Sequence, residues 1–286
     1  MYLDQRTKKF LKVFGIVALV FVLAGCKSNL DTNGQLIAER AINESTKWSL
    51  DAGIFDFILT IPIAKGILLI SNYLGIVGGV VGMTIFINLL TLPIMVKSTI
   101  SSQKMQLIQP EIERIQNKYR GRNDQASQMR MSVEMQNLYK KHNISMFGSF
   151  TTFLTLPIML AMWQSVQRLE VIYTTTFLGL NLGAKPLEMI TSGKLQYLLI
   201  VLIVGLTQFF AIQINQIMLK RNRKYRPSAQ QKQMNQMNYM MTIMIVWFSL
   251  SMPTAMSLYW ITTNLITVAR TVYIQLYHIE RENKGQ

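Results

Sequence analysis

Uncharged polar side chains recur at helical spacing within the most apolar parts of the chain. Thr84, Asn88 and Thr91 are four and three residues apart, so they share one face of a helix. Such groups make hydrogen bonds rather than covalent bonds, so the chemistry that they offer is the solvation of polar guests. Further residues of this kind lie on other apolar segments: Gln208, Asn215, Asn238, Thr242, Ser249, Trp260, Asn264, Thr267 and Thr271.

Two interpretations of these stripes remain open. Ser, Thr, Asn and Gln commonly hydrogen-bond between packed membrane helices, so each residue alone can be a helix contact. Stripes on four separate segments favour a shared wet cavity. A bundle of five helices is too small to enclose a wide pore, so a groove is the expected geometry.

Other chemistry has few candidate residues. The five apolar segments contain no Asp or Glu, and the whole chain has one Cys and two His, at positions 142 and 278. There is no Ser-His or Cys-His pair and no phosphate-cradling glycine loop. The sequence therefore predicts no enzyme active site, no metal centre and no cofactor.

The elements that carry the stripes are predicted membrane spans. Hydrophobic residues make up 50% of the 286 residues and charged residues only 15%, below the ~25% of soluble chains. Five segments approach the ~20 apolar residues that a helix needs to cross a bilayer. We expect an all-α polytopic membrane protein with spans at 74–96, 146–168, 194–218, 236–252 and 255–277.

Charge sets the expected orientation. The segment 54–70 contains Asp56 and Lys65, and a central charge costs ~2.5–3.5 kcal/mol on insertion scales, so an interfacial helix is expected there. Nine Lys or Arg then lie in 97–145 and six in 219–235, which the positive-inside rule places in the cytoplasm. These loops account for most of the +15 net charge without DNA, and an RNA or ribosome contact remains an additional possibility.

The N-terminus has the layout of a signal peptide: basic residues, an apolar stretch and small residues before Cys26. Leu23-Ala24-Gly25-Cys26 resembles a bacterial lipobox, so we expect acylation of Cys26; an uncleaved span with a chance Cys is the alternative. The expected organisation is a signal peptide at 1–25, an external lipid-anchored segment at 26–73, a core at 74–277 and a cytoplasmic tail at 278–286. Residues 97–145 have helical spacing interrupted near Gly121 and predict a cytoplasmic two-helix hairpin.

Several motifs in order give residues 48–277 a resemblance to the YidC/Oxa/Alb membrane protein insertases, in the lipoprotein form of Gram-positive bacteria. They are LLTLPIMVKSTISSQKMQLIQPEIERIQNKY, MSVEMQNLYKKHNI, LPIMLAMW and MPTAMSLYWITTN. The resemblance implies five spans after a short external helix, and a hydrophilic groove open to cytoplasm and lipid but closed outside. It implies nascent membrane proteins and lipid as partners, with the ribosome and the Sec translocon as further candidates.

The chain departs from the family pattern at one informative position. When the chain is aligned with the family at Pro93, Asn88 occupies the position where family members usually have an arginine in the first span. The family's usual Asn-Pro after the hairpin is replaced here by Asn143-Ile144-Ser145-Met146. Arg270 stands in the fifth span where a neutral residue is expected. We hypothesise that the groove's positive charge has moved to Arg270; the alternative is that Arg270 reaches out to headgroups.

The expected function is therefore a membrane insertase and folding chaperone in the bacterial cell membrane, with the C-terminus in the cytoplasm. A small transporter or channel, with the stripes lining a through-pathway, is the main alternative, although it would lack intramembrane carboxylates. An inactive lipid-anchored scaffold is a third.

Overall fold

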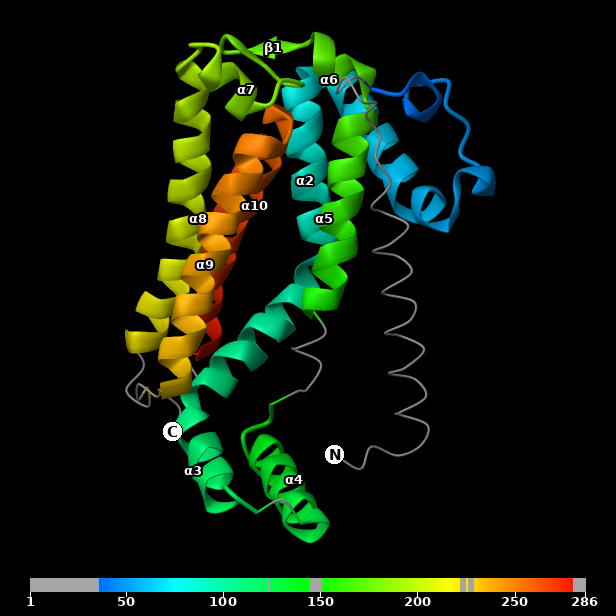
Figure 1. Cartoon of the computed structure of the whole chain (residues 1–286). Helices are drawn as coiled ribbons and strands as arrows, with labels where there is room; N and C mark the ends of the chain where they lie inside the picture. Colours follow the sequence, from blue (N-terminus) through cyan, green and yellow to red (C-terminus); the bar gives the residue numbers. More distant parts are fainter. Residues whose placement is uncertain (1–35, 123, 145–150, 222–224, 226–228, 280–286) are drawn as a thin grey trace.

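The chain is mostly helical. A computed structural model describes residues 36–122, 124–144, 151–221, 225 and 229–279. Figure 1 shows the longest helices side by side as a bundle, with α6, β1 and α7 at one end and α3 and α4 at the other. The bundle helices are α2 (Ile61–Leu107), α5 (Thr151–Arg168), α8 (Gln196–Arg221), α9 (Ala229–Ser251) and α10 (Thr254–Ile274).

Helix α2 consists of two arms that meet at Gly75. The π-helical turn η3 (Asp56–Thr60) leads into the first arm, and Gly75 has φ 68° and ψ 171°, a conformation that favours glycine. The arms pack closely, because a Cβ on Gly79 would lie 2.6 Å from the backbone oxygen of Ile67. The break at Gly75 falls beside the expected boundary between external segment and first span.

The second arm is longer than the sequence predicted. The first span was expected to end at 96, but α2 continues to Leu107. Ser, Gln, Lys and Met residues after Lys97 include no Pro or Gly that would end a helix. The polarity that ends a span therefore does not end this helix.

Two helices among the described residues are long enough and apolar enough to cross a membrane, judged by length and composition alone. They are the stretch Asp56–Leu107, of 52 residues, which includes the break at Gly75, and Gln196–Met218, of 23 residues.

The main core lies where α2, α5 and α10 meet, towards the end of the bundle that carries α6. Ile67 and Val80 from the two arms of α2 pack with Met162 of α5 and Met256 of α10, all of them buried. Thr254 closes the neighbouring loop, since its backbone N–H and its hydroxyl both donate to the carbonyl of Ala184. This end of the bundle is therefore densely packed.

The connection from α5 to α8 contains the only two-stranded pairing among the described residues, and an isolated parallel bridge joins Ile42 to Leu169. After α6 (Glu170–Thr174), the two-residue strands β1 (Thr176–Phe177) and β2 (Leu180–Asn181) pair antiparallel, and α7 (Pro186–Thr191) follows. No strand was predicted, because a two-residue pair leaves no measurable alternation in the sequence. Short helical turns also occur at η1 (Ala38–Arg40), η2 (Leu50–Ala52) and η5 (Gln275–Ile279).

Helices α3 (Gln109–Lys118) and α4 (Gln125–Lys141) pack against each other at the far end of the bundle (Figure 1). Ile112 of α3 and Leu138 of α4 are buried in their shared apolar cluster. The carboxylate of Asp124 accepts a hydrogen bond from the Ser127 N–H at 2.8 Å, which caps α4 and lowers the pKa of Asp124. Gly121, one of the expected turn residues, has φ 81°.

Candidate functional site

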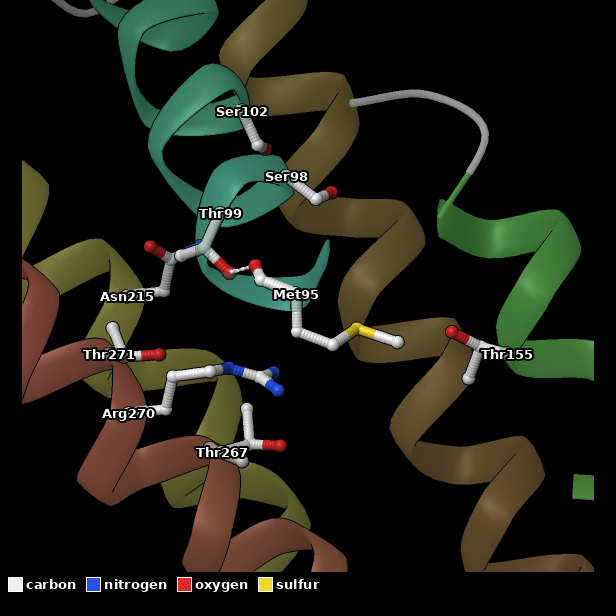
Figure 2. Close-up of a pocket in the computed structure, with 10 residues that line it drawn as sticks. Met95, Ser98, Thr99, Ser102, Thr155, Asn215, Thr267, Arg270 and Thr271 are labelled. Atoms are coloured by element: carbon white, nitrogen blue, oxygen red, sulfur yellow. Dashed lines mark hydrogen bonds between the residues drawn. The ribbon is translucent and has the colours of Figure 1, made fainter. Parts of the chain in front are cut away.

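A cavity of about 380 Å³ lies between four of the bundle helices. Four residues of α2 at helical spacing form one wall, and α8 and α10 form the opposite wall. Figure 2 shows the Arg270 and Thr267 side chains of α10 pointing into this space toward Met95 of α2. The lining residues are Met95, Ser98, Thr99, Ser102, Thr155, Ala211, Asn215, Thr267, Arg270 and Thr271.

Two of the helices that line this cavity do not pack closely against each other. Helix α10 packs extensively against both α8 and α2, and α5 packs against α2. Across the described residues, α5 and α8 share no substantial interface, although Thr155 of α5 and Asn215 of α8 both line the cavity. The arrangement is a recess with α10 at its back and with α5 and α8 as separate flanks.

The polarity of the recess comes from neutral groups and one cation. Its lining contains hydroxyls, the Asn215 amide and the guanidinium of Arg270, but no Asp or Glu. The hydroxyl of Thr99 donates to the Met95 carbonyl at 2.8 Å, so part of this polarity is satisfied within α2. Such a lining can solvate polar groups and attract an anion.

A buried amide pair joins α2 to α8 beside the recess. The side-chain nitrogen of Gln103, a fully buried residue, donates to the Asn215 side-chain oxygen at 3.2 Å. The Gln103 oxygen is buried without a hydrogen-bond partner among the described residues. This pair fixes the distance between two walls at the end of the recess that faces α3.

Of the ten span residues expected to face a groove, Thr267 and Arg270 line this recess, and Asn215 and Thr271 of the same stripes lie with them. The three polar residues of the first span are not among its lining. Their side chains donate instead to carbonyls one turn earlier: Thr84 to Val80 at 2.7 Å, Asn88 to Thr84 at 2.9 Å and Thr91 to Ile87 at 2.9 Å.

The remaining expected residues are spread over the bundle. Asn264 is buried and donates to the Thr207 hydroxyl at 3.3 Å, which is the helix contact of the alternative interpretation. Trp260 belongs to the main apolar core, and Thr242 donates to the Asn238 carbonyl at 3.1 Å. Gln208 is half-buried on α8. The expected lipidation site, Cys26, lies outside the described residues.

The sequence did not single out Ser98, Thr99 and Ser102 of α2. They follow Lys97 and were therefore assigned to the cytoplasmic segment, although Ser98 and Ser102 are four residues apart and Thr99 and Ser102 three, which marks one helix face. Reading the polar stripe of the first span past the charge would have found them.

A second polar cluster joins α3 to α4. The ammonium of Lys118 donates to the Glu134 carboxylate at 2.6 Å, and the Tyr119 hydroxyl donates to the same oxygen at 2.8 Å. The hydrogen bond from Lys118, followed by that from Tyr119, lowers the pKa of Glu134, while the bond to Glu134 raises the pKa of Lys118. The cluster fixes how the two helices meet and is distant from the recess.

Together the apolar helices and this lining define a helical membrane protein with a polar recess between its helices. The family model described as "60Kd inner membrane protein" matches residues 69–282. The chain therefore belongs to this family, and its resemblance to the insertases of Gram-positive bacteria is confirmed.

Similar proteins extend over nearly the full length. The chain is 28% identical to "Membrane protein insertase MisCA" of Bacillus subtilis (strain 168), over 100% of this chain and 97% of the relative. It is 31% identical to "Membrane protein insertase YidC" of Alkalihalophilus pseudofirmus, over 93% of this chain and 94% of the relative. It is 30% identical to the protein of the same name in Oceanobacillus iheyensis, over 93% of this chain and 96% of the relative.

Proposed function

We propose that this chain is a membrane protein insertase and folding chaperone that uses the recess as a hydrophilic groove. The observation that carries the proposal is the polar lining around Arg270, held between α2, α5, α8 and α10. The three relatives are named as membrane protein insertases, which supports the same function.

The physical role of the groove is to shorten the apolar path of a client. A polar or charged segment pays several kcal/mol for each unsatisfied group that enters hydrocarbon. Hydroxyls and amides in the groove replace part of the water that such a segment loses. The client's own apolar span then moves sideways into lipid between α5 and α8. This process needs no bond-making residues, so the protein acts without enzymatic chemistry.

The proposed topology has five spans: the second arm of α2, then α5, α8, α9 and α10. The densely packed end with α6 and α7 then lies outside, and α3 and α4 form a cytoplasmic hairpin. The basic segments 97–145 and 219–235 support this orientation. In this topology residues 1–25 are removed, Cys26 is acylated outside the cell membrane, and residues 278–286 are cytoplasmic.

Arg270 provides the positive charge that the family places in the first span. Its presence among the lining residues, and the absence of Asn88 from them, support this relocation. Thr267, from the same helix, supplies a neutral hydrogen-bonding group. Clients are nascent membrane proteins, delivered from the ribosome or through the Sec translocon.

Reconstitution tests the function. Purified chain in liposomes should integrate a short single-span client without a soluble energy source, measured as protection of the client span from protease. A channel would instead release a trapped ion and leave the client unprotected. Ion release without integration would overturn the proposal.

A further inference from the structure

Arg270 lacks an anionic partner. Among the described residues, none accepts a hydrogen bond from Arg270, and its Nε atom is buried without a partner. The cavity lining contains no carboxylate. Arg168 is different, since its guanidinium lies 2.6 Å from the Asp56 carboxylate. Arg270 as a whole is partly buried, and a cation within a span is costly without a partner, so an anion is expected beside it.

The groups around Arg270 suit a phosphate. A guanidinium presents a planar fork of donors that matches two phosphate oxygens. Figure 2 shows the Thr267 hydroxyl, one turn earlier on α10, beside the guanidinium. The Asn215 amide lines the same space. The cavity, of about 380 Å³, has room for a headgroup phosphate.

The depth of the cavity favours a lipid as the source. Helix α10 continues through the π-helical turn η5 to Ile279, and Figure 2 shows the Arg270 side chain beside Met95 of α2. The α2 wall, from Met95 to Ser102, spans the position of the exposed Lys97. In the proposed topology this level is the cytoplasmic edge of the hydrocarbon core, where phospholipid phosphates lie.

We infer that the recess is a binding site for the phosphate group of a phospholipid from the cytoplasmic leaflet, held by the Arg270 guanidinium. The lipid enters between α5 and α8, which have no substantial mutual interface in the described residues. This inference rests on the topology of the proposed function, and it names the occupant of the groove between clients.

Equilibrium binding to the full-length protein in detergent tests the inference. The probes are radiolabelled dioctanoyl-phosphatidylglycerol, dioctanoylglycerol without the phosphate, and inorganic phosphate as competitor. Arg270→Gln should weaken phospholipid binding about ten- to a hundredfold, because it removes charge-assisted hydrogen bonds. Arg270→Lys should be intermediate, since it keeps the charge without the fork. Lys97→Gln, a neighbouring exposed cation outside the cavity, should bind as the wild type does.

Three results would overturn the inference: equal phospholipid binding by wild type and Arg270→Gln, equal binding of dioctanoylglycerol, or an equal loss in Lys97→Gln. Displacement of the lipid by inorganic phosphate at equal concentration would assign the site to free phosphate instead. Apparent melting temperatures of the variants separate loss of the site from loss of the fold. No client is present, so failure here is distinct from failure of insertion.

Discussion

Arg168, the last residue of α5, places its guanidinium 2.6 Å from the carboxylate of Asp56, in the turn that leads into α2. Its Nε also donates to the Arg40 carbonyl at 2.7 Å. One side chain thus joins the second predicted span, the external helix and the N-terminal segment. The charge that argued against a span at 54–70 is neutralised by this contact.

Replacing Asp56 by Asn should destabilise this end of the bundle. The Arg168 and Asp56 side chains are only 11% and 20% exposed, so the lost pair leaves a partly buried cation, at a cost of about 1–3 kcal/mol. The apparent unfolding temperature in detergent should fall. Glu188→Gln is the matched control, because the Lys185–Glu188 pair is 32% and 60% exposed and should contribute little. Equal shifts in the two variants would contradict the structural role of Arg168.

Gly79→Ala should disrupt the packing between the arms of α2. The new Cβ would lie 2.6 Å from the Ile67 carbonyl oxygen, and backbone cannot move aside cheaply; overpacking of this kind costs about 1–3 kcal/mol. Gly66→Ala is a milder control, since its Cβ would meet the flexible end of Met83, with sulfur at 2.7 Å. Thermal unfolding of both variants is the measurement, and a smaller loss in Gly79→Ala would refute the close approach.

The contact between α3 and α4 should depend on pH at both extremes. The pKa of Glu134 is lowered from 4.5, so its stabilising contribution is present above that value and is lost as pH falls through the lower folded pKa. The pKa of Lys118 is raised from 10.5, so its contribution is present below that value and is lost as pH rises through the higher folded pKa. The protection of α4 amides from hydrogen exchange, corrected for the intrinsic pH dependence of exchange, should therefore not change with pH through this pair near neutrality. Glu134→Gln should remove the acid-side dependence; if that dependence persists, another group causes it.

Arg270→Gln should slow the insertion of a client with an acidic tail. A tenfold decrease, equivalent to about 1.4 kcal/mol, is expected if Arg270 attracts the tail. A client with a neutral tail of the same length should be affected much less. The assay is protease protection in proteoliposomes. If Arg270→Gln slowed both clients equally, the charge would have no selective role.

The helices were predictable because hydrophobicity and helix propensity act locally. Runs of apolar residues marked the segments of α5, α8, α9 and α10 to within a few residues at most ends. The end of α2 at Leu107 was not predictable, because Lys97 ends the apolar run without breaking the helix. The fold-back of the two arms depends on Gly75 and on the contact at Gly79, and glycine alone does not specify which partner it approaches.

The site was only partly predictable, because polar stripes show a helix face but not its hydrogen-bond partners. Asn88 donates to the carbonyl of Thr84 on its own helix, and Asn264 bonds to Thr207 on a neighbouring helix. Neither outcome is encoded in spacing. Arg270 could be singled out because a charged residue within a membrane span is costly and usually has a functional role.

The central claim is that water fills the recess while the outer faces of the same helix contact lipid. Cys26 is the only cysteine, so a Cys26→Ser chain can carry one reporter thiol in the recess, Thr267→Cys, or on the exposed outer face of α10, Leu265→Cys. In proteoliposomes a water-soluble maleimide, which reacts with the ionised thiolate, should label Thr267→Cys and leave Leu265→Cys largely unlabelled. An unlabelled Thr267→Cys would show that the recess is dry, and labelling of Leu265→Cys as fast as Thr267→Cys would show no contrast between the two faces; either result would contradict the account.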